Sequence, residues 1–366
     1  MSAHAPALAI STVASLLLAC GGEQPAPTPP ALADCSPGWQ PIYGRADLLE
    51  PPALAYGEDT LLFQTVEGEV AEPNADRAVI QALTTGDGIA RTLVADEAST
   101  LWVEDGTVFY THGGLQDQLF RVPLAGGAAA LVLDGGSAAP LIQSFPAGLD
   151  ASYFYWTWMN ELGPSSLSLW RMSRTGGSPE RLAPLPGVRD KVRLALAADG
   201  VIAADSHGVT GVVPFDGSAV RLLGAMPDSL DTRLVGVDGS GSYWLHSSIP
   251  AAEPREQAPS EILQVPADGS DPRPFWPEKP PLFAPSRLWA DPDGGWLVAG
   301  SEDFDDGHSH HAVWLLDPEG AGRRAACDPS VHLLDDSTQP AFSADAAYLV
   351  ATYAELHTWA IVRVAR

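Results

Sequence analysis

One short stretch, SEDFDDGHSHH from Ser301 to His311, concentrates side chains that can ligate a metal ion. Carboxylates suit Ca²⁺ and imidazoles suit Zn²⁺, so the mixture does not select one metal. The spacing matches neither the EF-hand loop nor the HExxH motif. An exposed polar hairpin loop is the simpler interpretation, and a Ca²⁺ or Zn²⁺ site is the alternative. The candidate ligands are Asp303, Asp305, Asp306, His308 and His310.

Motifs for nucleophilic or phosphate chemistry are absent from the sequence. It contains no G-x-S-x-G and no GxxxxGK, and Gly86-x-Gly88 lacks the third glycine of a dinucleotide fingerprint. The 46 acidic residues offer many carboxylate pairs, but nothing in the sequence shows which two face each other. We therefore nominate no catalytic residue and predict no other cofactor.

A dense aromatic cluster, YFYWTWM at 153–159 followed by Trp170, has two interpretations. The rings could stack on a sugar or peptide, or they could pack inside the protein, which is the commoner use of such residues. A Pro-rich insertion at 249–261 could help to shape a binding surface.

The N-terminal residues have the composition of an export signal. Residues 8–19 carry no charge and are too few to span a bilayer, and they lead directly into Leu17-Leu18-Ala19-Cys20. This pattern resembles the lipobox of bacterial lipoproteins, although no Lys or Arg precedes it. The resemblance implies removal of residues 1–19, lipid on Cys20 and anchoring in the bacterial cell envelope. An ordinary secretory signal or a short buried apolar segment is the alternative. The Pro-rich residues 20–36 read as an extended tether.

Composition narrows the possible partners of the remaining chain, residues 37–366. The 20 Lys and Arg against 46 Asp and Glu give a net charge of −26, which would repel a nucleic-acid backbone. With 45% hydrophobic residues, the chain can form a substantial core despite 35 Gly and 33 Pro. We expect no nucleic-acid partner.

A sequence repeat organises the domain. Six segments begin with a short apolar strand and place a glycine seven positions after the start, where a turn needs positive φ. A seventh, from Ile361, ends before its turn. The starts are Val79, Leu119, Leu169, Thr210, Ile262, Val313 and Ile361, and the glycines are Gly86, Gly126, Gly176, Gly217, Gly269 and Gly320.

The repeat predicts an all-β propeller. An upstream strand pair with its own turn precedes several repeats, as at 101–112, 194–206, 234–247 and 288–301, which gives four strands per unit. Four antiparallel strands every 40–52 residues are typical of propeller blades. We predict seven blades, with six or eight as alternatives. Residues 39–44 are expected to supply the strand that the last repeat lacks and so close the ring.

The two remaining cysteines fit this arrangement. In an exported protein Cys35 and Cys327 are an even pair, one just before the closing strand and the other at the end of the sixth repeat. We predict a disulfide between them. The alternative is two unrelated buried thiols.

The output strands RVPLAGG (121–127) and RMSRTGG (171–177) resemble those of bacterial TolB-like periplasmic propellers. This likeness is architectural and transfers no catalytic residues. Propellers commonly bind peptides, partner proteins or glycans, so by analogy of fold we predict an envelope module with such a partner. We also predict a monomer. A hydrolase or lyase with an acidic or metal-dependent site at the channel mouth is the alternative.

Overall fold

The computed structural model describes most of the predicted propeller domain and none of the first 37 residues. The described ranges contain strands and turns and no helix. They are residues 38–45, 53–66, 78–84, 89–98, 100–112, 118–134, 143–159, 167–185, 192–205, 208–225, 232–247, 260–328, 331–333, 339–353 and 358–366.

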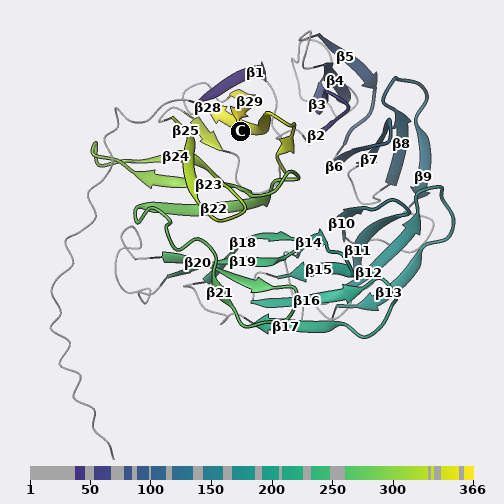
Figure 1. Ribbon diagram of the computed structural model, residues 1–366. Coiled ribbons are helices and arrows are strands. Elements are labelled where there is room, and N and C mark those ends of the chain that lie inside the picture. The colour runs from purple at the N-terminus through teal and green to yellow at the C-terminus, as the bar shows by residue number, and fades with distance from the viewer. Residues whose placement is uncertain are drawn as a thin grey trace, which may run out of the picture.

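Seven antiparallel sheets stand around a central axis as the blades of a propeller (Figure 1). Blade 1 contains β2 (Leu54–Gly57), β3 (Thr60–Val66), β4 (Ala78–Thr84) and β5 (Ala90–Val94). Blade 2 contains β6 (Thr100–Glu104), β7 (Thr107–His112), β8 (Gln118–Pro123) and β9 (Ala130–Asp134). Blade 3 contains β10 (Gln143–Leu149), β11 (Tyr153–Met159), β12 (Leu167–Ser173) and β13 (Glu180–Pro184).

The remaining blades continue the ring in sequence order. Blade 4 contains β14 (Arg193–Leu196), β15 (Gly200–Ala204), β16 (Val209–Pro214) and β17 (Arg221–Ala225). Blade 5 contains β18 (Thr232–Asp238), β19 (Gly241–Ser247), β20 (Ser260–Pro266) and β21 (Arg273–Pro274). Blade 6 contains β22 (Phe283–Ala290), β23 (Trp296–Asp303), β24 (Ser309–Leu316) and β25 (Gly322–Asp328). Blade 7 contains β26 (Val331–Leu333), β27 (Ala341–Phe342), β28 (Ala346–Tyr353), β29 (Thr358–Ala365) and β1 (Trp39–Arg45).

The N-terminal strand closes the ring as predicted. β1 pairs antiparallel with β29, from Trp39 opposite Val364 to Arg45 opposite Trp359, and becomes the outermost strand of blade 7. Tyr43 then reaches blade 1, where its hydroxyl lies 3.1 Å from Thr65 Oγ1 and its ring lies 4.5 Å from that of Phe63. The expectation of seven blades is confirmed: six have four strands, and in blade 7 the two short strands β26 and β27 both pair with β28 at the innermost position.

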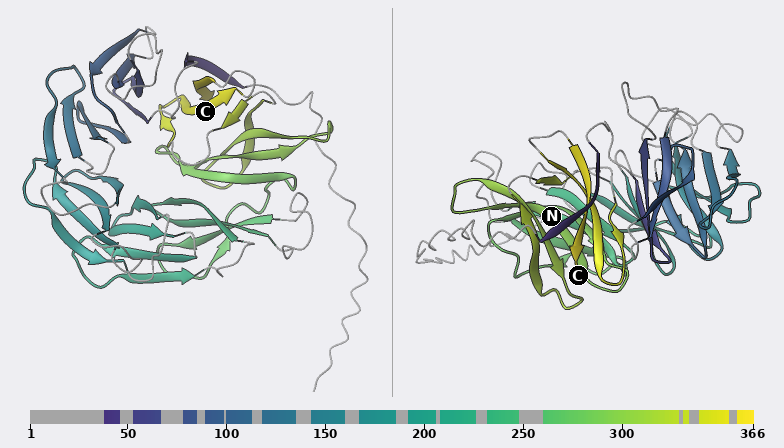
Figure 2. Two further views of the ribbon diagram at one scale, coloured as in Figure 1. Left: turned by 180° about the vertical axis from the view of Figure 1, so that it is seen from behind. Right: turned by 90° about the horizontal axis from the view of Figure 1, so that it is seen from above.

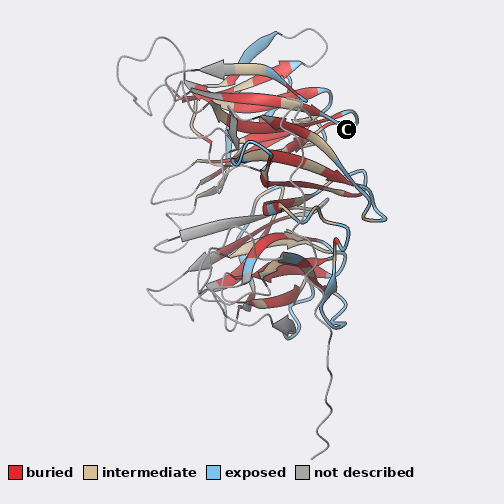
Figure 3. Cartoon of the chain, turned by 90° about the vertical axis from the view of Figure 1, so that its left-hand side faces the viewer, coloured by how far each residue is buried: buried red, intermediate tan, exposed pale blue. Residues whose placement is uncertain are grey.

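The hydrophobic core is divided among the gaps between blades. Each pair of neighbouring sheets encloses its own cluster of buried side chains, including the pair formed by blades 7 and 1. The first strand of each blade lies nearest the axis, as the left view of Figure 2 shows. First strands contact one another between blades 1 and 2, 3 and 4, 4 and 5, 5 and 6, and 7 and 1. The buried residues therefore lie along the strands of the blades, where they are coloured red in Figure 3.

The repeated glycines form the turns that the sequence predicts. In five described repeats the glycine has φ between 73° and 99°, and its N–H donates to the carbonyl three residues earlier. This geometry favours glycine because a Cβ would be strained there. The five are Gly126, Gly176, Gly217, Gly269 and Gly320, while Gly86 lies outside the described residues.

The two faces of the ring differ. One face, here named the turn face, carries two kinds of turn: those between first and second strands and those between third and fourth strands. Each turn between third and fourth strands has five or six residues. The opposite face, here named the variable face, carries the connections from second to third strands and from blade to blade. The second-to-third connections range from four to twelve residues. Figure 3 shows exposed turns and the C-terminus on one side.

Within the described residues, no helix has the length and apolar character needed to cross a membrane. The predicted signal (1–19) and tether (20–36) lie outside the described residues, as does most of the insertion at 249–261.

Candidate functional site

The predicted metal ligands occupy the hairpin between β23 and β24. Both carboxylate oxygens of Asp306 have partners within this turn. One oxygen lies 2.8 Å from His310 Nε2, and the other accepts the backbone N–H of His308 at 2.9 Å. These bonds, chiefly the one from His310, lower the pKa of Asp306. Asp303 accepts a hydrogen bond from Ser309. Asp305 lies exposed in the turn.

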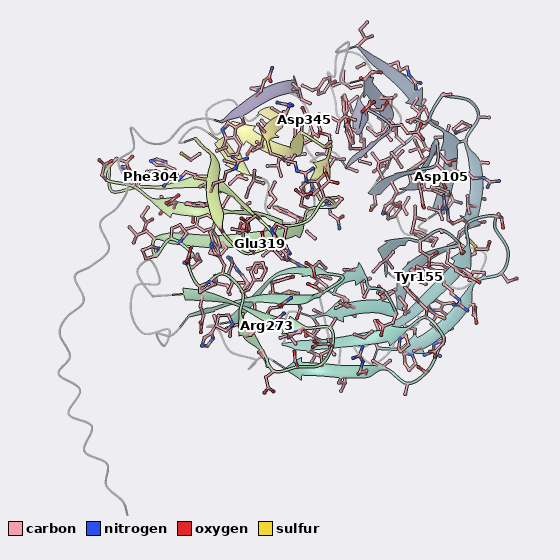
Figure 4. The ribbon with its side chains drawn as sticks, in the orientation of Figure 1. Asp105, Tyr155, Arg273, Phe304, Glu319 and Asp345 are labelled. Carbon is pink, nitrogen blue, oxygen red and sulfur yellow. The ribbon has the colours of Figure 1, made fainter. Side chains whose placement is uncertain are left out.

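This hairpin lies away from the channel. Its buried Phe304 packs near His310 and is found at the outer part of blade 6, where it is labelled in Figure 4. No three His, Cys, Asp or Glu side chains converge to hold a metal ion in the part of the chain that the structure describes. The arrangement is that of a polar hairpin whose carboxylates bind neighbouring groups, and the Ca²⁺ or Zn²⁺ site stays a prediction.

A buried ion pair anchors the base of the same hairpin. Glu302, 2% exposed, accepts two hydrogen bonds from Arg324, at 3.0 Å from Nε and 2.8 Å from Nη2. The Arg324 guanidinium also lies over the rings of Phe304 and Trp314. Lys279 donates to the carbonyls of Pro280 and Phe283, and its burial lowers its pKa to about 8, although Glu302 acts in the opposite direction. Every member of this group has a partner, which indicates a structural role.

Three rings of the aromatic cluster belong to the core. Phe154, Tyr155 and Trp156 are each at most 3% exposed and pack between blades. The Tyr155 hydroxyl donates to Asp150 at 2.8 Å. Packing between blades therefore accounts for these three rings, and the Trp158 side chain lies outside what the structure describes.

Of the three cysteines, only Cys327 lies among the described residues. It is fully buried near the end of β25. Cys20 and Cys35 lie outside the described residues, so lipid on Cys20 and the Cys35–Cys327 pairing stay predictions.

A row of arginines occupies one repeated position on the innermost strands of blades 4, 5 and 6. Strand register shows that the positions of Arg193, Arg233 and Arg287 are equivalent. Each arginine lies opposite a residue of the second strand, and that residue lies opposite the first residue of the sequence repeat on the third strand. These connections run through Ala204 to Thr210, through Leu245 to Ile262 and through Ala299 to Val313. The three arginines therefore lie at equivalent levels around the channel, toward the variable face.

Each of the first two arginines binds the next blade. Arg193 Nη1 donates to the Val235 carbonyl at 2.7 Å, and Arg233 Nη2 donates to the Pro285 carbonyl at 2.7 Å. Arg193 is half-buried, Arg233 is exposed, and Arg287 is 8% exposed. A guanidinium has five N–H donors, so such a group can hold a carbonyl and still bind a planar anion.

A His–Asp pair also faces the variable side, at the junction of blades 1 and 2. His112 Nδ1 lies 2.8 Å from Asp96 Oδ1, and Tyr110 donates to the other oxygen at 2.7 Å. Burial, aided by Asp96, raises the pKa of Tyr110. The His112 side chain is 38% exposed.

The sequence repeat did not reveal the arginine row. Arg193, Arg233 and Arg287 stand 17, 29 and 26 residues before the starts of their repeats, because the intervening connections differ in length. These positions share no common spacing in the sequence, and strand register is what aligns them.

Comparisons with known proteins identify the fold alone. No protein-family model matches the sequence, and no curated protein matches it. An acylaminoacyl peptidase in complex with a chloromethyl ketone is similar in structure, at 10% identity and a TM-score of 0.56, over 86% of this chain and 51% of that one. This chain therefore spans about half the length of that peptidase.

Two other solved structures extend the comparison. YCF48 bound to D1 peptide matches over 93% of this chain and 98% of its own, at 11% identity and a TM-score of 0.55. TolB from Acinetobacter baumannii aligns over 86% of this chain and 79% of its own, at 9% identity and a TM-score of 0.41. The chain is a seven-bladed β-propeller, and the structures similar to it include a peptidase and a protein solved with a bound peptide.

Proposed function

We propose that this protein is a lipid-anchored binding module of the bacterial cell envelope, whose propeller binds a protein, peptide or glycan at its variable face. The difference between the two faces carries this proposal. Third-to-fourth turns of nearly constant length form one face, whereas second-to-third connections of four to twelve residues form the other. Connections that vary on a rigid scaffold are where binding residues concentrate.

A protein or peptide partner is favoured within this group. YCF48 is bound to a peptide in its solved structure and matches over nearly the whole of both chains. Within the part of the chain that the structure describes, each innermost strand also presents one unpaired edge to the channel, and an extended peptide can pair with such an edge.

Selection of binders tests the choice of face. A phage-displayed library of random peptides would be selected on immobilised protein, and the enriched peptides measured against two variants of β22. Ala284 and Ala290 are both exposed and lie near opposite ends of this strand, toward the variable and turn faces respectively. Ala284→Trp should abolish binding, and Ala290→Trp should leave it unchanged. No enrichment, or loss with Ala290→Trp alone, would contradict the proposal.

Anchoring rests on the lipobox-like residues before Cys20. Cells fed an alkyne analogue of palmitate should incorporate it into the wild-type chain and not into Cys20→Ser. Incorporation that persists in the variant, or wild-type protein recovered unlabelled, would contradict lipid attachment at this residue.

Hydrolase or lyase chemistry is the second candidate, favoured by the Asp96–His112 pair at the variable face. A carboxylate that orients a partly exposed imidazole is an arrangement used for general base catalysis. If it operates here, p-nitrophenyl acetate or polygalacturonate should be turned over, and His112→Ala should stop the reaction while the exposed His308→Ala does not. Absence of turnover, or equal rates in all three proteins, would reject this candidate.

A further inference from the structure

Charge is sorted along the channel of this acidic protein. Among the described innermost strands, the two acidic residues, Glu104 and Asp238, are the last residues of β6 and β18 and so lie at the turn face. The arginine row lies toward the other end of the channel. Along the described innermost strands, positive side chains thus lie toward the variable-face mouth and negative ones at the turn face, in a protein whose net charge is −26.

The members of the row adjoin one another. Arg193 donates to Val235, which lies two residues after Arg233 on β18. Arg233 donates to Pro285, which lies two residues before Arg287 on β22. Each bond therefore brings one guanidinium beside the strand that carries the next arginine.

Arg193 and Arg233 are not neutralised within the part of the chain that the structure describes. Each donates one hydrogen bond to a carbonyl and forms no ion pair there. Other described arginines do pair with carboxylates. These are Arg171, Arg174, Arg221, Arg324, Arg363 and Arg366.

We propose that Arg193 and Arg233 form a carboxylate-binding site at the channel mouth, and that its ligand is an acidic peptide segment. This inference rests on the proposed binding function and names its ligand class. The planar guanidinium fork can bind a carboxylate through two parallel N–H bonds, and such bonds are about twice as strong as neutral ones. The carbonyl bonds of Val235 and Pro285 hold each fork in position beforehand.

The strand edges beside the arginines favour a peptide over an acidic glycan. Among the described residues, β14 pairs with β15 alone and β18 with β19 alone, so one edge of each faces the channel. An extended peptide supplies both the carboxylates and the backbone amides that pair with such an edge. A polyuronate supplies the carboxylates without those amides.

A pair of labelled peptides tests the site. Fluorescein-labelled penta-glutamate and penta-glutamine would be titrated with full-length protein by fluorescence anisotropy, at low and physiological salt. We expect penta-glutamate to bind at least about tenfold more tightly, despite its repulsion by the protein's net charge, and to weaken with salt. Equal affinities for the two peptides, or no binding of penta-glutamate, would overturn the proposal.

Matched variants locate the binding. The double variant Arg193→Gln/Arg233→Gln should lose about tenfold or more in affinity for penta-glutamate. Arg171→Gln is the control, because Arg171 also donates to the next blade, at 2.8 Å from the Phe215 carbonyl, but is paired with Glu180. An equal loss in Arg171→Gln would attribute the effect to loosened blades and reject the site.

Two further arms keep the outcomes distinct. The double variant Arg193→Lys/Arg233→Lys keeps both positive charges but lacks the guanidinium fork, so we expect its affinity for penta-glutamate to be intermediate. This variant remains informative even if the Gln variant folds poorly. An affinity equal to that of the wild type would reject recognition by the fork. If polygalacturonate binds with arginine dependence and penta-glutamate does not, the ligand is a glycan and the peptide assignment is wrong. If Ala284→Trp blocks the binding of selected neutral peptides but penta-glutamate does not bind the wild type, this inference alone is wrong and the proposed binding function stands.

Discussion

Asp238 joins two blades through one carboxylate. One oxygen accepts hydrogen bonds from Ser240 and Gly241 in its own turn, and the other accepts the Tyr243 hydroxyl at 2.8 Å and the Trp296 indole N–H at 2.9 Å. Trp296 belongs to blade 6, whereas Asp238 belongs to blade 5. Burial, with the Asp238 charge, raises the pKa of Tyr243, which keeps that hydroxyl a donor.

Replacement of this carboxylate should be costly. Asp238→Asn removes the charge and turns part of the acceptor into a donor, so we expect a loss of about 3 kcal/mol in the free energy of unfolding. Asp216→Asn is the control, because Asp216 is exposed and accepts the Ser218 N–H in a single turn, and it should lose less than about 1 kcal/mol. Urea unfolding measures both. Equal losses would show that Asp238 does not link the blades.

Lys279 makes stability depend on pH in a defined direction. Its pKa is about 8 in the folded protein against 10.5 for an ordinary lysine, chiefly because of burial. Between these values the unfolded chain binds more protons, so the wild type should gain stability relative to Lys279→Met as pH rises from about 8 to 10.5. Below pH 8 the difference should be constant. Urea unfolding of both proteins across this range checks the sign, and a falling difference would contradict it.

The sequence predicted the types of candidate residues better than their roles. The cluster from Asp303 to His310 was found from its composition, but its spacing could not show that Asp306 binds His308 and His310 within one turn. Which aromatic rings are buried likewise depends on which blade packs against them. These outcomes depend on contacts between distant segments, which composition does not encode.

At the scale of elements, the closing strand β1 connects the two ends of the described chain. Trp39, 8% exposed, packs among residues of blades 6 and 7. Without β1, the eight residues of β29 would present an unpaired edge, and such edges pair with other chains.

Truncation tests this closure. Protein that begins at residue 46 should self-associate, whereas protein that begins at residue 37 and keeps β1 should remain monomeric. Size-exclusion chromatography with light scattering at matched concentrations distinguishes them. A monomeric protein without β1 would show that the strand is not needed to cover β29.

Glycine spacing made the blades predictable from the sequence. The turn after the third strand has nearly constant length and needs positive φ, so its glycine recurs seven residues after each start. The connections between second and third strands vary in length, so Arg193, Arg233 and Arg287 have no common spacing from their repeats. Regular features were therefore visible in the sequence, and the arginine row became visible only through strand pairing.

At the scale of the whole molecule, the predicted Cys35–Cys327 disulfide would fasten the start of the domain to blade 6. The backbone at Gly38 already approaches β25 closely, since a Cβ there would lie 2.2 Å from the Ala325 carbonyl oxygen. Closing so long a loop should contribute about 4 to 5 kcal/mol in the chain-entropy model. We expect Cys35→Ser to lose stability on this scale, and peptide mapping without reduction to recover the linked pair. Two free thiols in the denatured wild type would reject the pairing.

The charge of the whole molecule also bears on binding. A net charge of −26 keeps the surface solvated and repels anions at a distance, so an acidic ligand must reach Arg193 and Arg233 at the channel mouth. Binding there should be confined to the variable face, because the turn face carries many carboxylates, including Asp105 and Asp345, which are labelled in Figure 4.

Hydrogen exchange with and without a selected peptide tests the location of binding most directly. We predict slower amide exchange at the variable-face ends of β14, β18 and β22, with no change at turn-face turns such as Asp105–Gly106. Protection confined to the turn face, or bound peptide without protection of these innermost strands, would contradict the assignment of the variable face as the binding surface.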